Sequence, residues 1–211
     1  MFGNVLTQFT RMAFATTALA CVYMEGATAQ QIASNVAPLG MDTSAPIGWE
    51  DFCSRNAQDC NVKSLRPASV ILDEQNWREI LKINAQVNRE VTPVTDMEHH
   101  GVAELWSYPE DGKGDCEDYV LEKRRRLMKA GFPRQALLIT VVRDHKGDGH
   151  AVLTVRTDRG DFILDNQAGK VLGWSETGYR FIKQQSQTHP NRWVSLGDFD
   201  NAPTATSSKS R

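Results

Sequence analysis

A cysteine at the start of a predicted helix is the first group in this chain that could act as a nucleophile. Cys116 lies in the stretch Gly112–Tyr119, which is followed by apolar residues at helical spacing that end before Gly131. Asp115 suits the N-cap position, and Asp118 three residues on could complete a capping box. The helix dipole favours a thiolate at this place, so we expect a lowered thiol pKa at Cys116. The alternative is a small buried hydrophobic residue, which describes most free cysteines.

A thiolate enzyme also needs a base and a group that orients the base, and two later residues fit these roles. His150 opens a predicted strand, and Asp165 closes the next one. A pairing of Arg156 with Asp161 across the intervening turn would make His150 and Asp165 diagonal neighbours on one face. A three-residue loop, for which Gly160 is also suited, would shift the register by one residue and separate them. The sequence therefore predicts a Cys-His-Asp triad that depends on this register.

The elements that must position these residues follow from hydrophobic periodicity. Helices are predicted over residues 72–91 and 116–130, and segments rich in Val, Ile, Leu and Phe at 136–143, 150–156 and 160–165 predict an antiparallel meander. Residues 174–186 are expected to form a strand or an irregular edge, and residues 193–196 a short strand. The fold class is therefore α+β, with N-terminal helices packed on an antiparallel β-sheet.

Composition excludes some classes of function. The chain has 211 residues, with 24 Lys and Arg against 26 Asp and Glu and a net charge of −2. This balance argues against a nucleic-acid-binding protein, which needs a basic surface. The length suits one domain with a substantial core. No run approaches the ~20 apolar residues of a membrane-spanning helix.

The N-terminal residues have the pattern of a secretory signal. A short apolar run from Met12 to Met24 follows Arg11, and an Ala-x-Ala ending predicts cleavage after Ala29. Residues 1–29 are thus read as a signal peptide, and the mature protein as periplasmic or secreted, with no membrane span. Two alternatives stay open: an amphipathic N-terminal helix, and a lipoprotein cleavage box ending at Cys21.

Domain boundaries follow from the same reading. Residues 30–48 are rich in Ala, Pro, Gly and Ser and are expected to be a flexible segment. Residues 49–199 would form the folded domain, and the small polar residues 200–211 a disordered tail.

Signal cleavage would leave three cysteines, of which two lie close together in the sequence and one lies apart. Cys53 and Cys60 are seven residues apart, a loop that a disulfide could close in an oxidising compartment. Whether they are bridged stays open at this point. Cys116 is then the leftover cysteine, either a free reactive thiol or one half of an intermolecular bridge.

Three ordered motifs resemble those of the bacterial transglutaminase-like cysteine proteinases, the family of the LapG-type periplasmic proteases. The motifs are Gly114–Tyr119, Gly149–Thr157 and Gly160–Asn166, and the resemblance extends from about Ala45 to Leu196. It implies a papain-like, transglutaminase-like core and a peptidase that forms a thioester acyl-enzyme. It implies Cys116 as nucleophile, His150 as base and Asp165 as orienting carboxylate.

The resemblance also implies a cation and partners. LapG-type members depend on calcium, so the acidic residues Asp115, Glu117 and Asp118 are candidate calcium ligands as well as helix caps, with Asp96 as an additional candidate. No cofactor is expected for the chemistry itself. The implied partners are a protein substrate, in characterised members a large surface adhesin released in biofilm control, and an inner-membrane receptor for cyclic di-GMP as regulator.

Two other functions are compatible with the same residues. An acyl transferase or transglutaminase would use the same triad and the same thioester. A non-catalytic, calcium-responsive binding domain would contain Cys116 only as a buried side chain.

Overall fold

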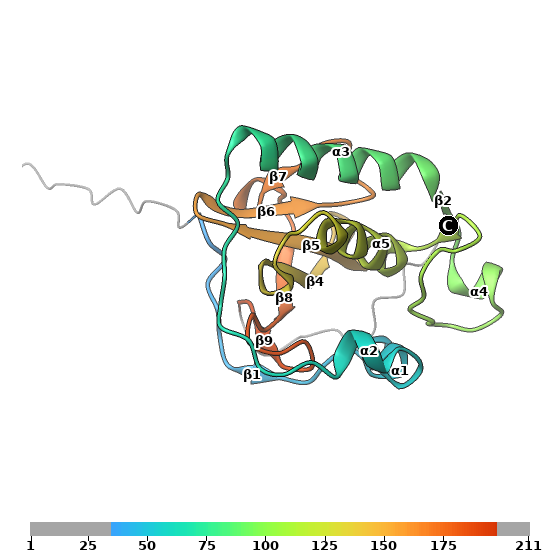
Figure 1. The fold of residues 1–211 in the computed structure, drawn as a ribbon. Coiled ribbons are helices and arrows are strands. Elements are labelled where there is room, and N and C mark those ends of the chain that lie inside the picture. Colours follow the sequence, from blue (N-terminus) through green and yellow to red (C-terminus); the bar gives the residue numbers. More distant parts are fainter. Residues whose placement is uncertain (1–34, 198–211) are drawn as a thin grey trace, which may run out of the picture. The chain divides into compact units, whose positions relative to one another are not determined.

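A seven-stranded antiparallel sheet forms the centre of residues 35–197, the part of the chain that the computed structural model describes (Figure 1). The strand order is β1 (Asp42–Thr43), β9 (Trp193–Ser195), β8 (Arg180–Gln185), β4 (Leu137–Arg143), β5 (Gly149–Thr157), β6 (Gly160–Leu164) and β7 (Leu172–Gly173). The predicted meander is confirmed as β4–β5–β6. The segment predicted at residues 174–186 turns through the short 3₁₀-helix η2 (Trp174–Glu176) before β8, which returns to pair with the opposite side of β4.

The helices precede most of the sheet in sequence. They are α1 (Ile47–Arg55), α2 (Ala57–Cys60), α3 (Glu74–Glu90), α4 (Asp96–His99) and α5 (Cys116–Lys129), followed by the 3₁₀-helix η1 (Arg134–Ala136). The two predicted helices are confirmed as α3 and α5. Asp73 caps α3, because its carboxylate accepts the backbone N–H of Asn76 at 2.7 Å. A two-stranded parallel ladder, β2 (Thr92–Pro93) with β3 (Lys113–Gly114), joins the chain before and after α4.

The main core lies between one face of the sheet and helices α3 and α5. Alternate residues of β4, Leu137, Ile139 and Val141, face this core together with Ile80 of α3 and Leu127 of α5. A second, smaller cluster on the other face contains Ala37, Val142, Val152, Ile163, Phe181 and Leu196. The α+β expectation, with helices packed on an antiparallel sheet, is therefore confirmed.

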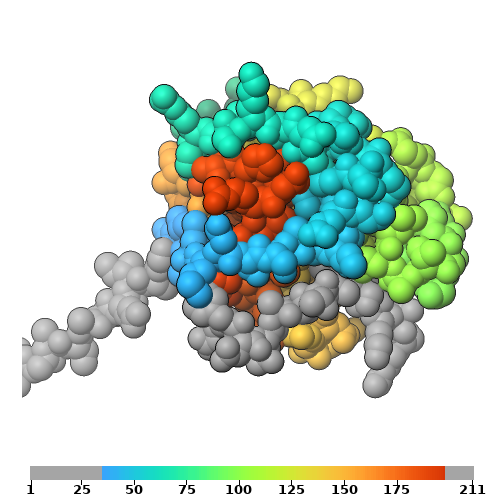
Figure 2. Space-filling view, turned by 90° about the horizontal axis from the view of Figure 1, so that it is seen from below, coloured from blue at the N-terminus to red at the C-terminus, as the bar shows by residue number. Residues whose placement is uncertain are grey.

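The expectation of a flexible segment over residues 30–48 is wrong for its described part. Asp42 and Thr43 form β1 against the edge of β9, and α1 already begins at Ile47. Ala37 is buried, and its N–H donates to the carboxylate of Asp161 at 3.1 Å. Figure 2 shows these first described residues, in blue, lying against the red C-terminal strands. A small-residue segment is ordered here because the sheet edge supplies its hydrogen-bond partners.

A disulfide joins Cys53 of α1 to Cys60 at the end of α2, with Cα atoms 5.6 Å apart. Cys116 lies apart from this bridge at the start of α5, and it is buried. None of the helices described here has the length and apolar character needed to cross a membrane. The expected signal peptide at residues 1–29 and tail at residues 200–211 lie outside the described residues.

Candidate active site

The loop before α5 fixes the position of Cys116. Backbone hydrogen bonds between β2 and β3 hold Gly114, and Asp115 follows as the N-cap residue. Asp118 accepts the backbone N–H of Asp115 at 3.3 Å, as in a capping box. A Cβ atom at Gly114 would lie 2.5 Å from the Asp118 carboxylate, so this close approach requires glycine. Cys116 is consequently the first helical residue, as predicted.

The hairpin of β5 and β6 brings His150 and Asp165 together in the predicted register. Arg156 pairs with Asp161 and Thr157 with Gly160, so the alternative three-residue loop does not occur. His150 Nε2 lies 2.8 Å from Asp165 Oδ1, and both side chains are buried. The cysteine reaches the same strand, because the N–H of Ala151 donates to Cys116 Sγ at 3.4 Å. His150 and Asp165 are therefore in contact, and Cys116 contacts the residue that follows His150 in β5.

Three residues that sequence reasoning did not identify hold Asp165 in place. The Tyr179 hydroxyl donates to Oδ2 at 2.7 Å, and the Gln167 backbone N–H donates to Oδ1 at 2.9 Å. Asn88 of α3 donates its side-chain amide to the backbone carbonyl of Asp165 at 2.8 Å. Burial raises the pKa of Asp165, but the hydrogen bond and charge of His150, with the Tyr179 hydroxyl, outweigh it and lower the pKa to about 2.

A surface pocket of about 260 Å³ opens onto the cysteine. Its lining comes from the stretch between β2 and α4, from the start of α5 and from the residues after β6. The lining residues are Pro93, Val94, Thr95, Glu98, Asp115, Cys116, Asn166 and Gln167. The Gln167 side-chain nitrogen is 3.4 Å from His150 Nδ1. Cys116 and Gln167 therefore both line this pocket, and Gln167 also contacts the second imidazole nitrogen of His150.

Acidic side chains gather around the start of α5. Oxygens of Asp96, Asp115 and Asp118 lie within 4.8 Å of one another, and Glu117 is adjacent. All four carboxyls are buried. Burial first, and then the other carboxylates of the group, raise the pKa of Asp115 to about 6 and that of Asp118 to about 8. The pKa of Glu117 is raised for the same reasons.

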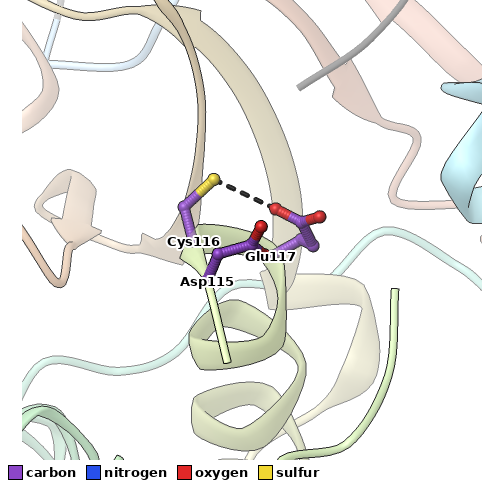
Figure 3. A group of neighbouring side chains, drawn as sticks. All are labelled: Asp115, Cys116 and Glu117. Carbon is purple, nitrogen blue, oxygen red and sulfur yellow. Dashed lines mark hydrogen bonds between the residues drawn. The ribbon is translucent and has the colours of Figure 1, made fainter. Parts of the chain in front are cut away.

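The thiol of Cys116 is hydrogen-bonded to one of these carboxyl groups. Cys116 Sγ donates to Glu117 Oε2 at 3.1 Å (Figure 3). Burial, followed by the charges of Glu117 and Asp115, raises the pKa of Cys116 well above its ordinary value. The expectation of a lowered pKa is therefore wrong for this arrangement. The partial charge of a helix end is weaker than full burial beside two carboxyls.

The acidic group fits a divalent cation. Asp115 Oδ1 and Glu117 Oε1 are buried without a hydrogen-bond partner among residues 35–197. Carboxylate oxygens are the hard ligands that calcium prefers, and a cation would offset the cost of burying them together. Asp96 belongs to the group, although its carboxylate also accepts the backbone N–H of Leu105.

A cysteine at a helix start, near a buried contact between a histidine and a carboxylate, is an arrangement that thiol enzymes can use. A model of the family described as "Bacterial transglutaminase-like cysteine proteinase BTLCP" matches residues 39–201, and the chain belongs to this family. The protein is accordingly a cysteine peptidase of the transglutaminase-like type, as the motifs predicted.

Solved structures of one relative are similar to this chain. "Legionella pneumophila LapG" is 26% identical, with 58% of this chain and 71% of that chain covered and a TM-score of 0.49. An EGTA-treated form is 24% identical, covering 59% and 69%, with a TM-score of 0.47. A calcium-bound form is 23% identical, covering 60% and 74%, with a TM-score of 0.49. No curated protein matches the chain.

Proposed function

We propose that this protein is an exported endopeptidase that cleaves a protein substrate with Cys116, His150 and Asp165. The observation that carries the proposal is the buried 2.8 Å contact between His150 and Asp165, beside the strand residue whose N–H contacts Cys116 Sγ. Separate elements converge on these three groups, which are the nucleophile, base and orienting acid that acyl transfer requires.

The hydrogen-bond pattern assigns a role to each imidazole nitrogen. Because Nε2 contacts the carboxylate of Asp165, the neutral imidazole carries its proton on Nε2. Nδ1 is then the base that accepts the proton of the Cys116 thiol and later delivers it to the leaving amine. The thiolate attacks the peptide carbonyl to form a thioester, which water hydrolyses. Backbone N–H groups at the start of α5, that of Cys116 included, would bind the oxyanion.

We propose that the acidic group binds calcium. Asp115, Glu117 and Asp118 would hold it, with Asp96 as a further ligand, and the bound cation would supply positive charge beside the thiol. The support is the chemistry of these buried oxygens, together with the existence of a calcium-bound structure of LapG. Calcium at 100 times its dissociation constant should add about 2.7 kcal/mol of stability, seen as a higher melting temperature than in EGTA. The double variant Asp96→Asn/Asp118→Asn should lose this response, and an undiminished response would contradict the assignment.

Export and partners are proposed on the pattern of the N-terminus and the resemblance to LapG-type proteases. The mature enzyme would act in the periplasm or outside the cell, following cleavage after Ala29. Its substrate would be a large surface adhesin, so that proteolysis releases the cell from a biofilm. A membrane receptor for cyclic di-GMP would restrain it.

The decisive test compares wild type with Cys116→Ala on a fraction of surface proteins from the native cell, with new N-termini identified by mass spectrometry. Wild type should produce new termini and the variant none, at an unchanged melting temperature. Cleavage by Cys116→Ala would refute the role of this residue.

A labelled amine in the same reaction reveals acyl transfer if an adduct replaces the hydrolysis product. If Cys116 does not react with iodoacetamide and no cleavage occurs, the protein is better described as a non-catalytic, calcium-responsive binding domain.

A further inference from the structure

The side chain of Gln167 lies between the pocket and the proposed base. Its amide nitrogen is 3.4 Å from His150 Nδ1, and Gln167 lines the same pocket of about 260 Å³ as Cys116. Gln167 is exposed, whereas His150 is buried. A molecule that enters the pocket therefore meets the Gln167 amide next to the nitrogen that acts as base.

The backbone that carries this side chain is held by two hydrogen bonds. The Gln167 N–H donates to Asp165 Oδ1 at 2.9 Å, and Asn88 of α3 donates to the Asp165 carbonyl at 2.8 Å. Neither bond uses the side chain of Gln167. A substitution that removes the amide should therefore leave Asp165 and the backbone around it in place.

The contact between the amide and Nδ1 is weak. Hydrogen bonds donated by N–H groups are mostly about 2.7–3.2 Å long, so a direct bond at 3.4 Å contributes little. An amide has both donors and an acceptor, and it can hydrogen-bond to a water molecule in either sense. A water molecule that contacts both groups replaces such a direct bond at small cost. Little is therefore lost when the amide turns from Nδ1 to a water molecule beside it.

Other polar side chains that line the pocket are less available to such a water molecule. Thr95 Oγ1 donates to Glu98 Oε2 at 2.9 Å, so these two side chains already satisfy each other. The side-chain oxygen of Asn166 is buried. The contact of Gln167 with His150 thus links an exposed polar group of the pocket directly to the base.

Hydrolysis of the acyl-enzyme requires a water molecule beside this base. The water oxygen attacks the thioester carbonyl carbon and forms a C–O bond, while one proton of the water passes to His150 Nδ1. The C–S bond then breaks, Sγ of Cys116 leaves as a thiolate and takes the proton from Nδ1, and the acyl group leaves as a carboxylic acid. The attacking water must therefore lie next to Nδ1, which is where the Gln167 amide is found.

We infer that the Gln167 side chain positions the water that hydrolyses the acyl-enzyme, and thereby favours hydrolysis over transfer to an amine. This inference rests on the proposed function. Water has no carbon chain by which a pocket could hold it, so its position depends on hydrogen bonds. An alkyl amine can in addition pack its chain against Pro93 and Val94, which line the pocket. Loss of the amide should consequently slow the attack of water more than the attack of an amine.

The test separates acylation from deacylation with p-nitrophenyl acetate as the acyl donor, in buffer that contains calcium. Gln167→Met keeps the length of the side chain and removes its hydrogen-bonding groups. The initial burst of nitrophenolate measures acetylation of Cys116, and the later steady release measures hydrolysis of the acetyl-enzyme. In Gln167→Met the burst rate should stay within about twofold of wild type. The steady rate should fall about tenfold, which corresponds to a loss of about 1.4 kcal/mol.

A dansylated pentylamine in the same reaction measures the choice between water and amine. At an amine concentration that gives wild type equal amounts of acetate and acetylated amine, Gln167→Met should form about ten times as much adduct as acetate. Gln135→Met is the matched control, because Gln135 lies on η1 and donates to the Arg66 carbonyl. The control should stay within about twofold of wild type in both rates and in the product ratio.

Hydrolysis by Gln167→Met within about twofold of the wild-type rate overturns the inference. So does slower hydrolysis without a larger share of adduct, because that result describes a residue that acts on His150 or on the fold. If wild type gives no burst of nitrophenolate, the proposed function fails and the inference falls with it. A wild-type burst with unchanged kinetics in Gln167→Met removes the inference alone.

Discussion

Removal of the Tyr179 hydroxyl tests how Asp165 is held. The Tyr179→Phe variant keeps the ring, which packs against His145 and His150 at centroid distances of 4.9 and 5.9 Å. It removes only the 2.7 Å hydrogen bond to Asp165 Oδ2. Hydrogen bonds to charged groups contribute about 1.5–3 kcal/mol, so we expect a loss of about 1.5 kcal/mol in the free energy of unfolding at pH 7.

The pH dependence of this loss follows from the pKa of Asp165. The folded-state pKa of about 2 lies below the ordinary value of 3.8, which corresponds to about 2.5 kcal/mol of stability near neutral pH. Because the pKa is lowered, this stability is present above about pH 4 and is lost as the pH falls through 2. Without the hydroxyl, the folded pKa moves back toward 3.8. The difference between wild type and variant should therefore fall by half or more between pH 4 and pH 2.

Urea unfolding at pH 7, 4, 3 and 2 measures this difference directly, with extrapolation to water. Tyr119→Phe is the matched control, because the Tyr119 hydroxyl donates to the uncharged backbone carbonyl of Val91. Its loss should be about 1 kcal/mol at each pH. A loss for Tyr179→Phe that is equally constant would show that the hydroxyl does not act on an ionised Asp165, and Tyr179 would then not hold the charged carboxylate in place.

Two further changes test the scaffold. The double variant Cys53→Ser/Cys60→Ser should lose about 2.5 kcal/mol, since the bridge closes a short loop, and reductant should lower the melting temperature of wild type but not of the variant. Arg156→Met should lose about 3–5 kcal/mol in urea unfolding, because the buried Asp161 carboxylate, 2.8 Å from the guanidinium, is left without its partner. Recovery of part of that loss in Arg156→Met/Asp161→Asn would identify the stranded charge as the cause.

Local patterns predicted the parts of the site that depend on a few neighbouring residues. The helix start at Cys116 follows from the acidic cap and the preceding glycine, both within two residues. The meeting of His150 with Asp165 follows from strand parity across one tight turn. Both features are short-range, but the sequence left two turn lengths open for the hairpin, and the observed register decides between them.

The groups that surround the proposed triad come from distant parts of the chain, and no local sequence pattern indicates them. Tyr179 reaches Asp165 from a segment beyond η2, and Asn88 reaches it from α3, 77 residues earlier in the sequence. The raised pKa of Cys116 was missed for a related reason. The partial charge at a helix end stabilises a thiolate by about 1 kcal/mol or less. Burial beside carboxyls opposes the thiolate, and it depends on packing that hydrophobic periodicity does not reveal.

The turn at residues 157–160 has a consequence for how this chain can diverge. Each residue added to or removed from one strand of the β5–β6 hairpin turns the following side chains to the opposite face. A single-residue insertion after Thr157 that shifted the pairing would carry Asp165 away from His150 while leaving the composition of β6 unchanged. We expect active descendants of this sequence to change the turn length only where a bulge or a second change restores the parity. Length variation should therefore be rarer in this turn than in the loop between β4 and β5, which ends before His150.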